Sequence, residues 1–194
     1  MSKFEFPWKR YTLIPELAKR LEGVSPQFGK TALQKLVYFL EAIYGIDCGY
    51  DFSLHSYGPF DSTLLGDLDL VAHWGCVSVT NTTGTLGGYR IEPTDQVDLV
   101  REKGKEFLDD PRTRAALDDL VDKYGRMTAR DLELRATTVY VDRSLRAKGE
   151  PHDKKTVCHC VGQVKPKFSA EEIERAVVEL DERGHIELAV ADRV

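Results

Sequence analysis

The sequence predicts an α+β protein, and three observations support this fold class. Apolar residues recur with the period of an amphipathic helix at both ends of the 194-residue chain. Three short runs between residues 51 and 91 have the character of strands. A turn-rich segment, residues 81–88, separates two of these runs in the way that the tip of a hairpin would. Helices are therefore expected to dominate, with a small amount of sheet in the first half.

Two helices are predicted before the first strand. The first follows Thr12, with Pro15 in its opening turn, where a proline costs no hydrogen bond. The second runs from Thr31 to Tyr44, and Gly45 ends it. Its apolar residues form one stripe, which is expected to face the core: Leu33, Leu36, Val37, Leu40, Ile43 and Tyr44.

A strand, a third helix and a hairpin are predicted next. The strand is expected at Asp51–Tyr57, and Pro59 then suits the first position of the third helix, which Gly75 ends. The hairpin pairs residues 76–79 with residues 89–91. The resulting order of helix, helix, strand, helix, strand, strand is that of a winged helix, with the hairpin as its wing.

The winged-helix-like domain is predicted to span residues 1–93, and residues 94–194 are predicted to form a mainly α-helical extension. Capping boxes that start at Thr128 and Ser169 mark the beginnings of two helices in this extension. A long loop is expected at residues 147–166, and a last strand near the C-terminal end. The boundary is a soft one, and the two halves either share a core or fold separately.

The composition is that of an ordinary globular protein, with 42% hydrophobic and 30% charged residues. No run of about 18 apolar residues is present, so no membrane-spanning helix is expected. The first residues, MSKFEFPWKRY, lack the apolar stretch of a signal peptide. The four cysteines lack the density of a disulfide framework. We therefore expect a cytoplasmic protein without membrane contact.

The sequence contains no motif that is typical of an enzyme. It lacks a GxxxxGK[ST] phosphate loop, a GxGxxG turn, a GxSxG elbow and an HExxH helix. The best metal candidate is Cys158-His159-Cys160, but its C-x-C spacing differs from the C-x₂₋₄-C pairs of common zinc sites. A half-buried strand at residues 157–161 explains these cysteines better. We therefore predict no enzyme activity, no metal site and no cofactor.

Positive charge is concentrated in one segment of a chain whose formal net charge is −5. This basic segment, residues 143–167, contains five candidates for contact with an anion or a nucleic acid: Arg143, Arg146, Lys148, Lys154 and Lys155. The alternative is a solvated flexible loop. The third helix, which enters the DNA groove in a winged helix, is acidic and contains no Lys or Arg. Nucleic-acid binding is therefore compatible with the sequence but not favoured.

Two motifs point to a known family. They are K-x-x-L-Q-K-L-V-Y-F-L at Lys30–Leu40 and S-Y-G-P-F at Ser56–Phe60, followed by a leucine-spaced helix. Residues 28–80 with these motifs resemble the SocA/Panacea antitoxin-like domain, whose relatives include the C-terminal domain of the DarG antitoxin. The resemblance implies protein binding, either to neutralise a toxin by contact or to deliver it to a protease. The chain has no macrodomain, so reversal of ADP-ribosylation is not implied.

The expected contact surface combines three parts of the first half. The candidates are Lys35 and Tyr38 from the second helix, Tyr57, Gly58, Pro59 and Phe60 from the turn, and Asp61, Asp67 and Asp69 from the acidic helix. The aspartates would take the place of DNA phosphates before a basic toxin surface. The alternative for the turn residues is that they only fix the corner between the strand and the helix.

We therefore predict a non-enzymatic protein-binding module of the antitoxin or proteolytic-adaptor type, whose partner is a protein such as a toxin. The alternative is a winged-helix DNA-binding regulator that uses the basic segment. A homodimer is compatible with either function.

Overall fold

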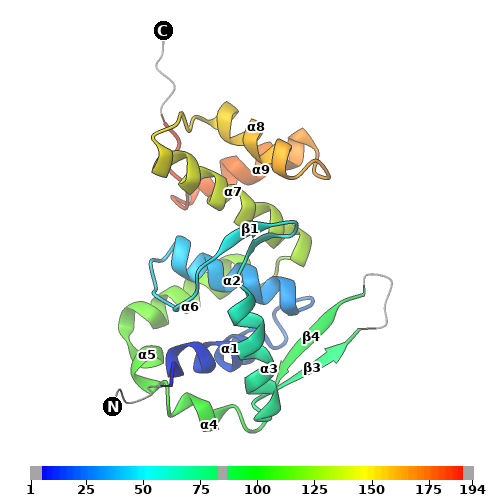
Figure 1. The fold of residues 1–194 in the computed structure, drawn as a ribbon, viewed down its shortest axis with the longest axis vertical. Coiled ribbons are helices and arrows are strands. Elements are labelled where there is room, and N and C mark those ends of the chain that lie inside the picture. The colour runs from blue at the N-terminus through cyan, green and yellow to red at the C-terminus, as the bar shows by residue number, and fades with distance from the viewer. Residues whose placement is uncertain (1–5, 83–86, 190–194) are drawn as a thin grey trace.

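The computed structural model describes residues 6–82 and 87–189 and confirms the α+β class. The first half contains α1 (Trp8–Leu21), α2 (Lys30–Ala42), β1 (Ser53–His55), β2 (Gly58–Phe60), α3 (Ser62–His73), β3 (Val77–Asn81) and β4 (Tyr89–Pro93). The second half contains α4 (Asp98–Arg101), α5 (Lys105–Asp109), α6 (Pro111–Tyr124), α7 (Ala129–Lys148), α8 (Lys154–Val164) and α9 (Ala170–Glu182). Figure 1 shows their arrangement.

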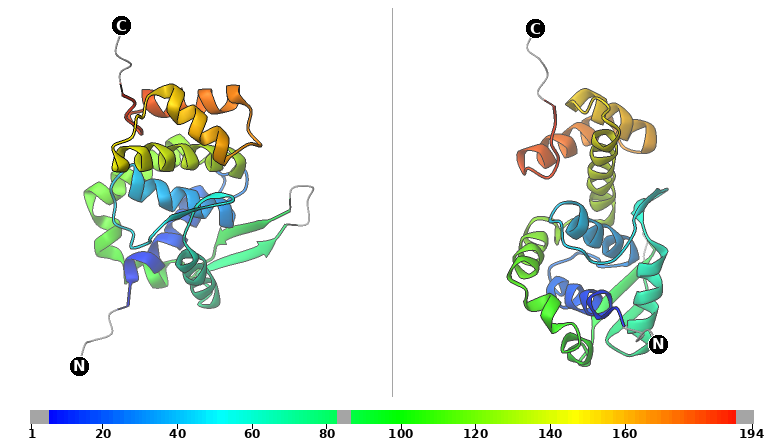
Figure 2. Two further views of the ribbon diagram at one scale, coloured as in Figure 1. Left: turned by 45° about the horizontal axis from the view of Figure 1, so that its top comes forward. Right: turned by 60° about the vertical axis from the view of Figure 1, so that its left-hand side comes forward.

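Helix α2 lies at the centre of the molecule. Every residue from Ala32 to Leu40 is buried, and the helix contacts α6, α7, β2 and β4. In both views of Figure 2, α7 lies between α2 and the pair α8–α9, while α1 lies on the other side of α2. The contacts of α2 with α6 and α7 cross the predicted boundary near Pro93, and one cluster of buried side chains includes residues of both halves.

The strands form two separate antiparallel hairpins. Hairpin β3–β4 pairs Val77 with Pro93 at one end and Asn81 with Tyr89 at the other, at the place where we predicted a hairpin. Part of its predicted tip, residues 83–86, lies outside the described residues. Hairpin β1–β2 was not predicted as such, and β1 pairs with β2 rather than with the β3–β4 hairpin in the described part of the chain.

The corner between β1 and α3 differs from its prediction. We expected Pro59 at the first position of the third helix, but Gly58 reverses the chain with a φ of 90° and Pro59 lies in β2. Helix α3 begins only at Ser62. Asp61 is its N-cap, and Asp61 Oδ1 accepts a hydrogen bond of 2.6 Å from Thr63 N.

The first helix also differs at its start. Helix α1 begins at Trp8 after Pro7, rather than after Thr12, so Pro15 lies inside the helix and not in its opening turn. Lys9 and Arg10 thereby become part of a helix that packs on α3.

The second half confirms the two capping boxes but not the long loop. Thr128 with Asp131 and Ser169 with Glu172 form reciprocal caps at the starts of α7 and α9. The predicted loop at residues 147–166 is wrong, because α7 continues to Lys148 and α8 occupies most of the remainder.

Helix α8 also corrects the predicted strand at residues 157–161. Asp153 caps the helix, since its Oδ1 accepts a hydrogen bond of 2.9 Å from Thr156 N, and Cys158 and Cys160 therefore lie on a helix. The last predicted strand, residues 186–190, is absent as far as Ala189, and Val190 lies outside the described residues. Among the helices that the structure describes, none combines the length and the apolar character that crossing a bilayer requires.

Candidate partner-binding site

The turn between β1 and β2 is fixed from one side by two neighbouring side chains of α2. Lys35 Nζ donates a hydrogen bond of 2.7 Å to the carbonyl oxygen of Pro59. The Gln34 side chain donates to Asp61 O at 2.7 Å and accepts from Asp61 N at 3.0 Å. Both side chains are buried, and Lys35 is only 1% exposed. The expectation that Lys35 faces a partner from the surface is therefore wrong.

The same turn is fixed from the other side by charged residues of the second half. Lys165 Nζ donates to the carbonyl oxygen of Ser56 and lies 2.9 Å from Glu133 Oε1 in an ion pair. Lys167 Nζ donates to Glu133 Oε2 at 2.8 Å. Glu133 and Lys165 are buried. We call Lys35, Glu133, Lys165 and Lys167 the lysine clamp of the β1–β2 turn.

The lysine clamp contains three cations and one anion, and this balance affects Lys35. Burial lowers its pKa from the ordinary 10.5 to about 8; Glu133 opposes this change and Lys165 adds to it. A buried lysine is tolerated here because its ammonium group donates to a carbonyl oxygen and lies near a carboxylate.

Gly58 is required at the turn for two reasons. Its φ of 90° is a conformation that residues with a side chain rarely adopt. A Cβ atom at this position would lie 3.0 Å from Thr137 Oγ1 and 3.3 Å from Lys35 Cε. Gly58 and Pro59 are both buried. Their placement favours the interpretation that they fix the corner of the chain.

Tyr57 is the residue of the turn that faces solvent. At 66% exposure, it is the most exposed of the large hydrophobic side chains in the described part of the chain. Lys167 Nζ lies 5.4 Å from the centroid of its ring. Phe60 is half-buried, and its ring centroid lies 5.0 Å from that of His55. The lysine clamp thus holds the backbone on both sides of an exposed aromatic ring.

The three aspartates of the predicted acidic surface do not lie together at the surface. Asp67 is buried, forms an ion pair with Arg10 at 2.8 Å and accepts a hydrogen bond of 3.0 Å from Tyr50 Oη. Asp61 is buried as the cap of α3. Only Asp69 of the three is exposed. The expectation of an acidic helix face that imitates phosphates is therefore wrong for two of its three residues.

Most of the predicted basic segment is engaged within the protein. Arg146 forms ion pairs of 2.7 Å with Asp142 and 3.1 Å with Glu187, and Lys154 pairs with Glu174 at 2.6 Å. Arg143 donates to the carbonyl oxygen of Ala42 at 2.7 Å. Lys148 and Lys155 are exposed and form no ion pair with the residues that the structure describes. The segment is thus less positive than its sequence indicates.

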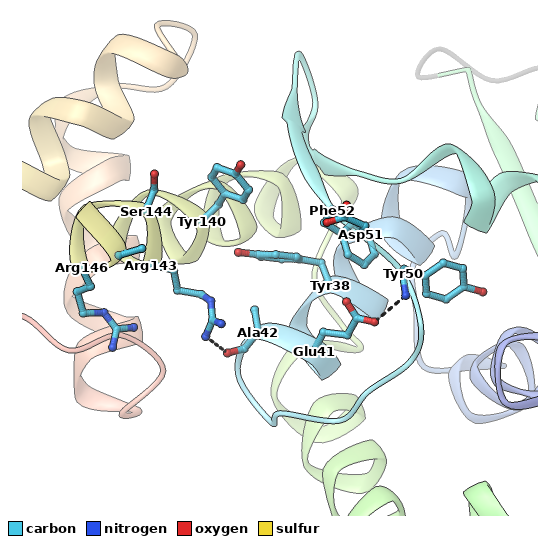
Figure 3. A pocket seen from close by; sticks show the side chains of 11 residues that line it. Tyr38, Glu41, Ala42, Tyr50, Asp51, Phe52, Tyr140, Arg143, Ser144 and Arg146 are labelled. Carbon is cyan, nitrogen blue, oxygen red and sulfur yellow. Dashed lines mark hydrogen bonds between the residues drawn. The ribbon is translucent and has the colours of Figure 1, made fainter. Parts of the chain in front are cut away.

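The structure brings Tyr38 together with two of the basic residues in an open hollow between α2 and α7. Its volume is about 540 Å³. Figure 3 shows the rings of Tyr38, Phe52 and Tyr140 around this hollow, which we call the aromatic hollow. Its polar lining consists of Glu41, Asp51, Arg143, Ser144 and Arg146. Tyr38 itself is buried and forms part of the floor of this hollow.

The cysteines do not form a metal site with their neighbours. Within residues 6–82 and 87–189, no group of three or more His, Cys, Asp or Glu side chains could hold a metal ion. Burial raises the pKa of the Cys158 thiol, with Glu174 adding to the rise and Lys154 opposing it.

Three residues that build the site were not found from the sequence. Gln34 and Glu133 lie inside apolar stretches of their helices, and Lys165 belongs to the basic segment, where it was counted as one more surface charge. A polar residue between buried neighbours, such as Glu133 between Leu132 and Leu134, is a usable signal because a buried charge requires a partner. The sequence does not say which partner it has.

Comparison with known proteins adds no family assignment, because no protein-family model and no curated protein matches the chain. The resemblance of residues 28–80 to the SocA/Panacea domain therefore stays a prediction.

Proposed function

We propose that this protein is a non-enzymatic protein-binding module, antitoxin-like or proteolytic-adaptor-like, that contacts its partner through Tyr57. One observation carries this proposal: an aromatic ring with 66% of its surface exposed lies on a turn whose backbone is fixed on both sides by buried side chains. Tyrosine is among the residues that dominate the energy of protein interfaces. The resemblance of the same segment to an antitoxin-like domain supports a toxin as partner.

The rigidity of the turn supports binding through Tyr57. Ordering a flexible loop on binding costs conformational entropy, and a turn that is already ordered avoids this cost. Ser56 O, Pro59 O and the backbone of Asp61 are all held by side chains from other elements. The partner would provide a recess for the phenol ring, with an acidic rim that complements Lys167 beside it.

The burial of two aspartates changes the surface that we propose. Asp61 and Asp67 are used inside the protein, so an acidic helix no longer supports the idea of a phosphate mimic. The winged-helix description of residues 1–93, the cytoplasmic location and the homodimer remain expectations. The proposal depends on none of them.

The experiment is an affinity capture of the tagged full-length chain from its host, with nuclease treatment, compared between two tyrosine variants. Tyr57→Ala removes the proposed anchor. Tyr89→Ala is the matched control, because Tyr89 is likewise an exposed tyrosine of a hairpin, with 41% of its surface accessible. It also lies beside a lysine, since Lys30 Nζ is 4.1 Å from its ring centroid. We expect a stoichiometric protein partner that Tyr57→Ala loses and Tyr89→Ala retains.

Two results would contradict the proposal. A protein partner that Tyr57→Ala still captures would move the contact surface away from the turn. Recovery of nucleic acid alone, with an affinity that falls steeply with salt and with charge reversal at Lys154 and Lys155, would favour the DNA-binding regulator.

A further inference from the structure

The aromatic hollow contains a hydroxyl group that is available to a ligand. Tyr38 is 6% exposed, and its Oη forms no hydrogen bond with the described part of the chain. Figure 3 shows this hydroxyl pointing into the space between Tyr140 and Arg143. Burial raises the pKa of Tyr38, so the phenol is neutral and can donate a hydrogen bond. A hydroxyl that no protein group engages can bond water or a ligand atom that enters the hollow.

Arg143 supplies unused donors on the same side of the hollow. Its guanidinium carries five N–H groups, and among the described residues only Nη1 is engaged, in the 2.7 Å contact with Ala42 O. Arg143 is exposed, lines the hollow and acts electrostatically on the Tyr38 phenol. A phenol can donate or accept a hydrogen bond and a guanidinium only donates, so both groups can donate to one ligand atom. A negatively charged oxygen is the strongest acceptor for this pair.

Two carboxylates and a second arginine also line the hollow. Glu41 Oε1 accepts a hydrogen bond of 3.1 Å from Tyr50 N, and Figure 3 shows its carboxylate turned toward that loop. Arg146 is neutralised by Asp142 and Glu187. The carboxylate of Asp51 is exposed. Arg143, which acts electrostatically on the Tyr38 phenol, is thus the cation that a ligand carboxylate would pair with beside the Tyr38 hydroxyl.

The remaining walls are aromatic. The ring centroid of Tyr38 lies 5.4 Å from that of Phe52 and 6.2 Å from that of Tyr140. These are the distances of aromatic pairs in contact, so the three rings form one apolar wall against which a flat group can pack in an offset or edge-to-face arrangement. The volume of about 540 Å³ lies within the range of small-molecule sites.

We propose that the aromatic hollow is a binding site for a small planar carboxylate, with its carboxylate on Tyr38 Oη and Arg143 and its ring against the aromatic wall of Phe52 and Tyr140. The hollow shares no residue with the lysine clamp or with Tyr57. This site therefore does not depend on the proposed protein partner, and either proposal can fail without the other.

The test is a titration of the full chain followed by amide NMR spectra, with benzoate as the probe. Benzylamine has a similar ring and the opposite charge, and benzyl alcohol has no charge. We expect saturable shifts with benzoate at residues of the hollow, with a Kd on the order of 1 mM because the site is open and the probe is small. Benzylamine and benzyl alcohol should bind more weakly.

Two conservative variants assign the contacts. Tyr38→Phe keeps the ring and removes the hydroxyl, and should weaken benzoate binding by about 5-fold, while Arg143→Gln should weaken it by about 10-fold or more. The matched control is Arg112→Gln. Arg112 also donates to a carbonyl oxygen just after α2, Tyr44 O at 3.1 Å, but it lies outside the hollow.

The proposal would be overturned if benzoate at about 20 mM, well above the expected Kd, produced no saturable shift. It would also be overturned if benzylamine bound more tightly than benzoate, or if neither Tyr38→Phe nor Arg143→Gln weakened benzoate binding. Equal losses in Arg112→Gln and Arg143→Gln would also overturn it, because the effect would then come from the net charge of the protein.

Discussion

The two hairpins of this protein are stabilised in different ways. Hairpin β3–β4 has strands of five residues and a ladder of five paired positions. Hairpin β1–β2 has strands of only three residues, and an isolated hairpin of this kind is marginally stable at best. Its turn is instead held by side chains of α2, α7 and the segment after α8. The position of Tyr57 therefore depends on residues that are more than a hundred positions away, such as Lys165.

This comparison implies that the lysine clamp stabilises the fold of the protein as well as the candidate site. The β3–β4 hairpin has lighter support: Gln27 Nε2 donates to the carbonyl oxygens of Gly87 and Tyr89, and Ile91 N donates to Phe28 O at 2.7 Å. A change in the clamp should thus affect the β1–β2 turn and the global stability, whereas a matched change in or near β3–β4 should have a smaller effect.

The largest effect is expected for Glu133→Gln. This change leaves Lys165 buried without its counter-charge, and breaking one partner of a buried ion pair costs about 3–5 kcal/mol of unfolding free energy. Urea unfolding at pH 7 measures it. The control is Glu174→Gln, which removes an exposed Glu–Lys pair with Lys154 and should leave the stability unchanged. Equal effects of the two changes would mean that Glu133 is not an essential part of the clamp.

The pH dependence of stability tests Lys35. Its folded-state pKa is about 8 and its ordinary value is 10.5, so between these pH values the unfolded chain binds more protons than the folded one. The contribution of Lys35 therefore makes stability rise with pH from about 8 to 10.5, by up to about 3 kcal/mol at 1.36 kcal/mol per unit. Below pH 8 the penalty for the buried charge is fully present.

The measurement is the difference between the unfolding free energies of the wild type and Lys35→Met across this range. The difference removes the contributions of tyrosines and cysteines, which titrate in both proteins. The rise should disappear in Lys35→Met, which has no titrating amine at this position. A variant with the same pH profile as the wild type would show that Lys35 is not the responsible group.

The third prediction compares one glycine in each hairpin turn. Gly58→Ala places a Cβ 3.0 Å from Thr137 Oγ1 at a φ of 90°, and should cost about 2 kcal/mol of unfolding free energy. Gly87→Ala has the same kind of backbone, with a φ of 56°, but no atom of the other described residues lies within 4 Å of the new Cβ, and it should cost about 1 kcal/mol. Thermal or urea unfolding of both variants gives the comparison. A larger loss at Gly87 would mean that the β1–β2 turn can move away from α7.

The sequence predicts the regular parts of this fold well and the polar contacts poorly. The apolar stripe of α2, the caps at Thr128 and Ser169 and the hairpin at β3–β4 all follow from local patterns. Local patterns work there because the determining interactions lie within a few residues of one another.

The structure differs from the prediction where contacts between residues far apart in the sequence determine the local conformation. From its sequence, Lys35 is a typical surface residue of an amphipathic helix. In the folded protein its ammonium group is buried, where it donates to Pro59 O and lies near Glu133. Residues 147–166 read as a loop because Gly149 and Pro151 interrupt the helical pattern, but the chain resumes a helix after the Asp153 cap. The aromatic hollow combines Tyr38 of α2 with Arg143 of α7, and only the packing of those two helices brings them together.

The smallest expected effect concerns two neighbouring threonines of α7 that are both fully buried. Thr138 Oγ1 donates a hydrogen bond of 2.9 Å to Leu134 O, whereas Thr137 Oγ1 faces Gly58 without a hydrogen-bond partner in the described part of the chain. Replacing an unpaired buried hydroxyl by a methyl group removes a desolvation penalty, so Thr137→Val should stabilise the protein by up to about 1 kcal/mol. Thr138→Val loses a hydrogen bond and should be destabilising by about 0.5–1 kcal/mol.

Urea unfolding of the two variants decides what the β1–β2 turn requires from α7. If Thr137→Val is neutral or stabilising, α7 contributes shape at this contact, and Lys35 and Lys165 supply the polar part of the turn's support. If Thr137→Val instead costs as much as Thr138→Val, the Thr137 hydroxyl stabilises the turn as well. The lysine clamp would then extend along α7 from Glu133 by one helical turn, because residues four apart lie on the same face.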